Sequence, residues 1–159
     1  MYHLASATKK HSHKIDVKGT ERLLEKAKEF GIKHFVYISI VGVDQLPLKY
    51  FKIKRAAEKV VIQSGLPYTI LRATQFYDFF EQEVRRYGKW PVVFVPSAIK
   101  YQPIETRIVA NRLFELGLGK PNNQLVEIGG SQQIRFGQAI KAWAKHHKRI
   151  NLRLPIPLE

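Results

Sequence analysis

The sequence predicts an α/β protein in which one parallel β-sheet carries helices on both faces. Short apolar runs rich in β-branched residues alternate along the chain with longer segments whose apolar residues recur at helical spacing. The segments that connect them are short. Parallel strands need crossover connections, and helical crossovers are right-handed, so a single sheet covered on both sides is the simplest fold for this order.

The first half of the chain alternates between the two kinds of segment. Residues 33–40 are almost continuously hydrophobic, as expected for a strand that is covered on both faces. Gly31 suits the end of the preceding helix, because glycine readily adopts the left-handed backbone found there. The strands expected in this half are residues 1–5, 33–40 and 68–72, and the expected helices are residues 16–30 and 48–63.

The second half is predicted to add helices and shorter strands. Proline stands at both ends of the run PVVFVP, which suits the termini of a strand. Gly129 and Gly130 are interpreted as a tight turn in preference to an anion-binding loop. The helices expected here are residues 74–87, 105–118 and 136–147, and the extended segments are residues 91–96, 100–103, 124–128 and 151–155.

Composition excludes several classes of function. The chain has 159 residues, the size of one domain, and no cysteine, which rules out disulfides, thiolate catalysis and cysteine-based metal sites. The paired histidines lack acidic neighbours, so no metal site is predicted. The apolar runs are short and no signal-peptide pattern opens the chain, so we expect a soluble cytoplasmic protein without a membrane segment.

The charge balance is strongly basic, with a formal net charge of +14. Basic residues gather at residues 9–14 and again at residues 141–153. Such an excess attracts polyanions without specifying one. No recognition helix, zinc finger or aromatic RNA-binding pattern accompanies it, so a solvated basic surface is favoured over a nucleic-acid partner.

A candidate acid/base site lies between residues 35 and 59. Tyr50 and Lys54 are four residues apart on a predicted helix and therefore share one face, which follows a strand that ends at Ser39. A phenol has an ordinary pKa near 10, and a neighbouring ammonium favours its ionised form. We predict that Tyr50 exchanges a proton, that Lys54 lowers its pKa, and that Ser39 holds the reacting oxygen.

Several segments resemble one family, the short-chain dehydrogenase/reductases, and within it the atypical, NmrA-like NAD(P)-binding branch. These segments are HLAS at 3–6, DVKGTERLLEKAKEFGIKHFVYIS at 16–39, the pair Tyr50 and Lys54, SGLPYTILRATQFYDF at 64–79, YQPIETRIVANRLFE at 101–115 and EIGG at 127–130. The resemblance implies a Rossmann-like sheet, an NAD or NADP cofactor and oxidoreductase activity on a small molecule that the sequence does not identify.

The resemblance also implies which residues form the site. Ser39, Tyr50 and Lys54 match the catalytic Ser, Tyr and Lys of the family, and Lys54 would also bind the nicotinamide ribose. The residues that match its cofactor-lining loops follow the first and third predicted strands; they are Leu4, Ala5 and Ser6, and then Ala73, Thr74, Gln75 and Phe76.

The chain departs from the family pattern at three places. Asp16 stands where many members have Asn, and Ile108 replaces the Asp of an Asp-Val-Ala motif. No part of the sequence matches the opening strand, the GxxGxxG turn and its helix, which present backbone N–H groups to the pyrophosphate. We therefore expect residues 1–159 to form a single, N-terminally truncated NAD(P)-binding domain, with substrate-side elements from about residue 76 onward and weak or absent dinucleotide binding.

Without the opening strand, residues 1–5 are expected to form an uncovered sheet edge. This edge is predicted to pair with a second copy of the chain, to be covered by residues 9–14, or to promote aggregation. Two functions stay open: an oxidoreductase, which the chain alone is expected to perform poorly, or a non-catalytic module that senses a dinucleotide or binds a partner.

Two further groups of residues leave alternatives open. Arg72 ends a predicted strand and is expected to face either a phosphate or carboxylate ligand or a surface ion-pair partner. The aromatic residues Phe76, Tyr77, Phe79 and Phe80 would line a substrate pocket in the family, whereas their helical spacing favours core packing for at least half of them.

Overall fold

The computed structural model describes residues 1–7, 12–96, 100–149 and 152–156. The chain divides into two compact units. Unit 1 consists of Met1–Ala73 and Ile108–Ile128, and unit 2 consists of Thr74–Arg107 and Gly129–Glu159. Each unit has its own buried core, and the two are described in turn.

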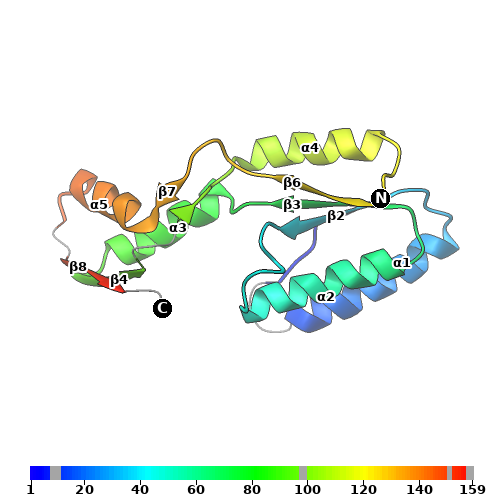
Figure 1. Ribbon diagram of the computed structural model, residues 1–159, viewed down its shortest axis with the longest axis horizontal. Coiled ribbons are helices and arrows are strands. Elements are labelled where there is room, and N and C mark those ends of the chain that lie inside the picture. The colour runs from blue at the N-terminus through cyan, green and yellow to red at the C-terminus, as the bar shows by residue number, and fades with distance from the viewer. Residues whose placement is uncertain (8–11, 97–99, 150–151, 157–159) are drawn as a thin grey trace. The chain divides into compact units, whose positions relative to one another are not determined.

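Unit 1 is built on a parallel sheet with the strand order β1-β2-β3-β6. Figure 1 shows α1 and α2 on one face of this sheet and α4 on the other. The predicted Rossmann-like α/β class with helices on both faces is therefore confirmed. The strands are β1 (Tyr2–His3), β2 (Phe35–Ile40), β3 (Tyr68–Ala73) and β6 (Gln124–Ile128).

The helices of unit 1 lie where the apolar spacing predicts them. The segment expected at residues 16–30 begins as a π-helical turn, η1 (Lys14–Gly19), and continues as α1 (Thr20–Glu29). Gly31 follows with φ of +63°, as its predicted role at the helix end requires. The other helices are α2 (Lys49–Gln63) and α4 (Thr106–Leu118).

Apolar packing holds η1, α1 and α2 against the sheet. Ala27, Phe35, Ala57, Val61 and Ile70 are completely buried in one cluster that joins these helices to β2 and β3. Burial of each large side chain stabilises the fold by about 1.5–3 kcal/mol. This core fixes the face of α2 that looks toward the sheet, and hence the direction in which Tyr50 and Lys54 project.

β1 forms one end of the described sheet, as the strand order predicts. It is shorter than expected, because the segment after His3 leaves the sheet and Ser6 and Ala7 instead donate hydrogen bonds to Asp16. Residues 9–11 of the predicted covering segment lie outside the described residues. What occupies the outer side of β1 stays a prediction.

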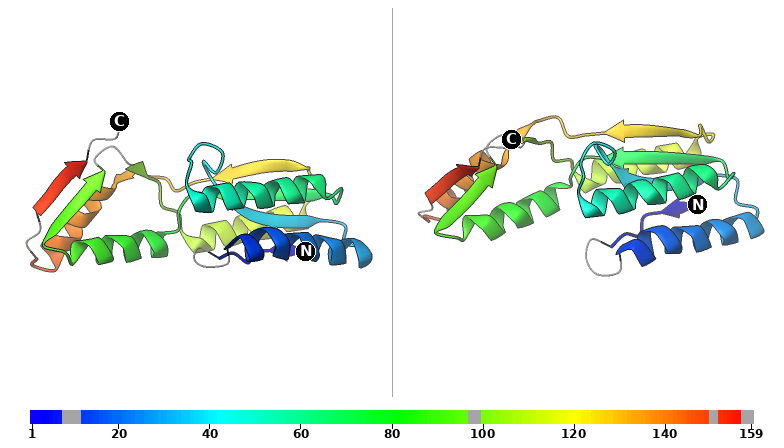
Figure 2. Two further views of the ribbon diagram at one scale, coloured as in Figure 1. Left: turned by 90° about the horizontal axis from the view of Figure 1, so that it is seen from below. Right: turned by 60° about the horizontal axis from the view of Figure 1, so that its bottom comes forward.

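Unit 2 combines two helices with two small sheets. α3 (Tyr77–Gly88) and α5 (Phe136–His146) pack together, and β4 (Val92–Pro96) pairs in parallel with β8 (Leu152–Ile156), as Figure 2 shows. β5 (Lys100–Tyr101) pairs antiparallel with β7 (Ile134–Arg135), a strand too short to be predicted from the sequence.

The core of unit 2 is mainly aromatic. The Phe136 ring lies 6.0 Å from the Phe80 ring, 5.6 Å from that of Tyr87 and 5.3 Å from that of Tyr101, measured between centroids. Of the four aromatic residues considered for a pocket, Phe80 is buried, whereas Tyr77 and Phe79 are exposed. Core packing therefore accounts for Phe80 and not for those two.

Candidate active site

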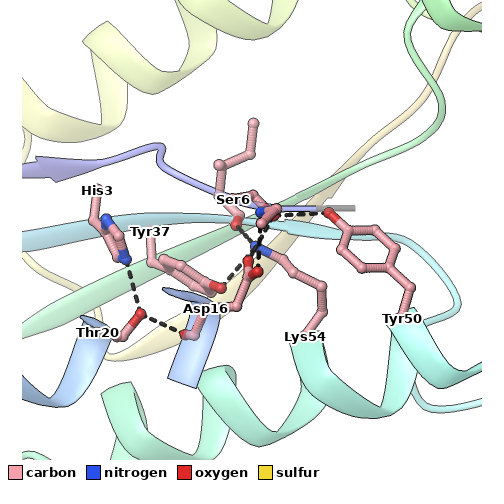
Figure 3. A network of polar contacts seen from close by, with 9 residues as sticks. His3, Ser6, Asp16, Thr20, Tyr37, Tyr50 and Lys54 are labelled. Carbon is pink, nitrogen blue, oxygen red and sulfur yellow. Dashed lines mark hydrogen bonds and ion pairs between the residues drawn. The ribbon is translucent and has the colours of Figure 1, made fainter. Parts of the chain in front are cut away.

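Tyr50 and Lys54 lie one turn apart on α2 and reach the same group of polar residues, as Figure 3 shows. The Lys54 ammonium donates hydrogen bonds to Tyr37 Oη at 2.7 Å and to the carbonyl oxygen of Ile38 at 2.9 Å. The Lys54 side chain is only 2% exposed. Two of the three N–H groups of the amine that the family pattern assigns to a ribose are thus used on β2.

Asp16, on the π-helical turn η1, is the anion at the centre of this network. Its side chain is fully buried, and one carboxylate oxygen lies 3.9 Å from Lys54 Nζ. Oδ1 accepts a hydrogen bond from Ser6 Oγ at 2.5 Å, and Oδ2 accepts one from the backbone N–H of Ala7 at 3.0 Å. A buried charge is tolerated only when it is paired and hydrogen-bonded, and Asp16 meets both conditions.

Tyr50 is half-buried and contacts this group through one bond, 2.8 Å from its Oη to Ser6 Oγ. Burial raises the pKa of Tyr50 above its ordinary value; the Ser6 hydrogen bond offsets part of the rise, and the negative charge of Asp16 adds to it. Burial, the Ser6 hydrogen bond and the Asp16 carboxylate are the causes of this shift, whereas the Lys54 ammonium is hydrogen-bonded to β2. That Lys54 lowers the pKa of Tyr50 stays a prediction.

Lys54 itself is perturbed by its surroundings. Burial lowers the pKa of the ammonium to about 8, although the negative charges of Asp16 and Glu58 act in the opposite direction. Burial likewise raises the pKa of Tyr37 far above its ordinary value, so this phenol stays protonated. At neutral pH a pKa of about 8 still leaves the ammonium mostly protonated, so Lys54 can donate its hydrogen bond to the neutral Tyr37 phenol.

A second chain of polar contacts reaches the same turn from β1. Thr20 Oγ1 donates to the backbone carbonyl of Asp16 at 2.6 Å and lies 2.8 Å from His3 Nε2. Because the hydroxyl proton is used on Asp16, the imidazole N–H is the donor to Thr20. His3 and Thr20 have no role that a local sequence pattern predicts, because only the fold brings β1 beside the turn.

Ser39 lies outside this network. In β2 it is two residues after Tyr37, so both side chains are on the same face of the strand. The Ser39 hydroxyl is buried, and it has no hydrogen-bond partner among the described residues. A buried hydroxyl without a partner is costly unless a ligand satisfies it.

Arg72 pairs in register with Ser39 on the neighbouring strand. Its guanidinium binds Glu58 through Nε at 2.9 Å and Nη2 at 2.8 Å, Asp44 at 3.1 Å, and Glu127 at 3.5 Å. Of the two alternatives for this residue, the structure shows the ion pair. The bidentate contact with Glu58 fastens β3 to α2 near the site.

The predicted cofactor-lining residues fall into two groups. Leu4, Ala5 and Ser6 are exposed after β1, and Ser6 is tied to the catalytic candidates through Asp16 and Tyr50. Ala73 ends β3 in unit 1. Thr74, Gln75 and Phe76 belong to unit 2. The Thr74 hydroxyl is buried and has no hydrogen-bond partner among the described residues. The carbonyl of Gln75 accepts a hydrogen bond from the Ile104 N–H, and Phe76 forms an isolated β-bridge with Ile104.

A parallel sheet covered by helices, with a polar site beyond the carboxyl ends of its strands, defines the class of Rossmann-like nucleotide-binding proteins. A family described as NAD(P)H-binding matches residues 3–93, more than half of the chain. The chain belongs to this NAD(P)H-binding family, with relatives of the atypical short-chain dehydrogenase/reductase, NmrA-like type. Its members are NAD(P)-binding, oxidoreductase-like proteins.

Among curated proteins, the chain is 33% identical over 132 residues to the chloroplastic divinyl chlorophyllide a 8-vinyl-reductase of Arabidopsis thaliana, an alignment that covers 76% of this chain and 31% of the relative. It is 34% identical over 68 residues to a photosystem II assembly factor of Cyanophora paradoxa, covering 41% and 21%. The chain thus spans about a third or less of the length of these relatives.

Solved structures share the fold. An NADPH-dependent quinone oxidoreductase of Escherichia coli, complexed with NADPH, superposes with a TM-score of 0.79 at 16% identity over 98% of this chain and 54% of the other. A triphenylmethane reductase of Citrobacter sp. superposes with a TM-score of 0.73 at 14% identity, over 98% and 55%. Within the part of this chain that the structure describes, no helix has the length and apolar character needed to cross a membrane.

Proposed function

We propose that this chain forms the proton-donating side of an NAD(P)-dependent oxidoreductase site. One observation carries the proposal: Tyr50 and Lys54 meet in a single polar network beyond β1 and β2, where Ser39 presents an unsatisfied hydroxyl on the same sheet face. Ligands of such sheets bind at the carboxyl ends of the strands. Membership of the NAD(P)H-binding family supports a dinucleotide as the ligand.

Each catalytic candidate has a role that its surroundings support. Bound NAD(P)H would supply the hydride in a reduction. Tyr50 holds a proton at neutral pH, because a phenol has an ordinary pKa near 10 and burial raises it further, and is the proton donor. Ser39 donates a hydrogen bond to the substrate oxygen through its otherwise unpartnered hydroxyl. Lys54 holds Tyr37 and the end of β2 in place through two of its three N–H groups.

The residues present fit the nicotinamide side of a dinucleotide better than its pyrophosphate side. The buried hydroxyl of Ser39 suits a hydrogen-bonding partner on a polar ligand. The sequence has no GxxGxxG turn to donate backbone N–H groups to phosphates. Each charge-assisted hydrogen bond that is lost costs about 1.5–3 kcal/mol, so we expect this chain alone to bind NAD or NADP weakly.

The remaining assignments are proposals of the same kind. We propose that Leu4, Ala5, Ser6, Ala73, Thr74, Gln75 and Phe76 line the cofactor, and that residues from about 76 onward face the substrate. The substrate itself, pairing of β1 with a second copy and the cytoplasmic location stay predictions. Two of the relatives are chloroplastic by name, so the comparisons do not favour a cytoplasmic location.

Isothermal titration with NADPH and NADH tests the proposal. We expect binding with a dissociation constant on the order of micromolar or weaker, which Lys54→Met reduces and which Lys52→Met, on the exposed side of α2, leaves unchanged. No heat with either dinucleotide at the highest soluble protein concentration would contradict the proposal. That result would favour the alternative, a module that binds a partner without catalysis.

A further inference from the structure

We infer that Asp16 is a positioning residue that acts through Ser6 to keep Tyr50 in the role of proton donor. The inference adds a residue to the proposed function and rests on that function, because Tyr50 acts as a proton donor only in an oxidoreductase site. It concerns the carboxylate that stands where many members of the family have an amide.

The direction of each hydrogen bond follows from the chemistry of the three groups. An ionised carboxylate only accepts, so the single proton of the Ser6 hydroxyl is used on Asp16 Oδ1, 2.5 Å away. Ser6 Oγ therefore offers only a lone pair to Tyr50 Oη at 2.8 Å. Tyr50 must be the donor, and the chain of bonds runs from the phenol through the hydroxyl to the carboxylate.

The carboxylate keeps its charge because the fold surrounds it with compensating groups. Lys54 Nζ lies 3.9 Å away, and the Ala7 backbone N–H binds the second oxygen at 3.0 Å. The titratable groups that face this turn are His3 from β1, Tyr37 from β2, and Tyr50, Lys54 and Glu58 from α2. Of these groups, Tyr50 is the one that Ser6 connects to the Asp16 carboxylate by hydrogen bonds.

This arrangement makes ionisation of Tyr50 unfavourable for two reasons. A phenolate at this place would face Asp16 across a single hydroxyl, and the Ser6 proton could satisfy only one of the two anions. The phenol therefore rests as the protonated partner of Ser6, which is the state from which it can give a proton to a substrate that is reduced. An amide at position 16 would lack the charge and could also donate, so it would leave the phenol free to ionise.

The ionisation of Tyr50 can be measured without any cofactor or activity. The phenolate absorbance of the protein is followed against pH, the curve of Tyr50→Phe is subtracted, and circular dichroism defines the pH range in which the chain is folded. We expect Tyr50 to ionise above the ordinary value of about 10. Asp16→Asn should raise the ionisation constant of Tyr50 about tenfold or more. Glu21→Gln, an exposed carboxylate on α1, should leave it unchanged.

Ser6 provides an independent test should Asp16→Asn not fold. Ser6→Ala removes the hydroxyl that connects the phenol to the carboxylate and that offsets part of the rise in the pKa of Tyr50, so Tyr50 should ionise less readily, whereas Ser6→Thr keeps a hydroxyl and should retain the original curve. An unchanged curve in Asp16→Asn, or a Tyr50 that ionises more readily in Ser6→Ala, would overturn the inference. Since no dinucleotide is present, failure of NADPH binding leaves this measurement intact, and the two failures are distinguishable.

Discussion

The two units of this protein are stabilised in different ways. Unit 1 buries ionisable groups beside its sheet, where the side chains of Asp16, Lys54 and Glu58 are almost completely enclosed. The core of unit 2 consists mainly of aromatic side chains: Phe136 contacts Phe80, Tyr87 and Tyr101, and Phe80 also contacts Tyr101. A buried ionic network demands every partner, whereas an apolar core depends mainly on filled volume. We therefore expect the stability of unit 1 to depend strongly on single charges and on pH, and that of unit 2 to depend on the size of its buried side chains.

The strongest test of the difference removes the buried anion. Asp16→Ala leaves the Lys54 ammonium and the Ala7 N–H without their partner, and we expect a loss of about 3–5 kcal/mol in the free energy of unfolding. Urea unfolding followed by circular dichroism measures this loss. Both tryptophans, Trp90 and Trp143, belong to unit 2, so their fluorescence shows whether that unit unfolds with unit 1.

Glu21→Ala is the matched control, since this carboxylate is exposed on the neighbouring helix and should change the unfolding free energy by less than about 0.5 kcal/mol. Equal effects of the two substitutions would show that the Asp16 network contributes nothing special to unit 1.

The second test removes volume from unit 2. Phe136→Ala takes away a ring that is 7% exposed and contacts three others, and we expect a loss of about 3 kcal/mol that does not depend on pH between 6 and 9. Phe79→Ala is the control, because the Phe79 side chain is 47% exposed. Tryptophan fluorescence during urea unfolding reports the effect. A strong pH dependence of the loss would remove the contrast with unit 1.

The third test uses pH alone. The pKa of Lys54 is lowered to about 8 in the folded state, below its ordinary value of 10.5, so between these values the unfolded chain binds more protons and the folded state gains stability as pH rises. We expect a gain of about 2 kcal/mol between pH 8 and about 9.5. Above pH 10 the raised pKa values of Tyr37 and Tyr50 reverse the trend.

Lys54→Met should abolish the gain, and Lys52→Met, which replaces an exposed lysine of the same helix, should retain it. If the gain survives in Lys54→Met, another group is responsible and the buried ammonium does not govern the pH response of unit 1.

Local patterns predicted most of the fold. The nearly continuous hydrophobic run that contains β2 and the helical spacing before Gly31 led to the correct elements within about three residues, because these signals lie in neighbouring residues. β7 was not predicted, since two residues carry no periodicity and form a strand only by pairing with β5. β1 was predicted too long, because hydrogen bonds to Asp16 take the chain out of the sheet after His3.

The site was predictable in part. The spacing of Tyr50 and Lys54 places both on one face of α2, and they do reach a common network. The partner of Lys54 could not be predicted, since Tyr37 becomes its neighbour only when α2 packs across β2. The sequence singled out Asp16 only because it stands where many members of the family have Asn. Its central position depends on contacts with segments that are distant in sequence, since Ser6 and Ala7 follow β1 and Lys54 belongs to α2.

The group around Arg72 has a consequence for ligands that carry a phosphate. Three carboxylates surround one guanidinium, and the charges of Arg55 and Lys54 also act on two of these carboxylates, Asp44 and Glu58. The Arg72 guanidinium is therefore engaged by protein carboxylates, and an incoming phosphate group would have to displace one of them to bind it.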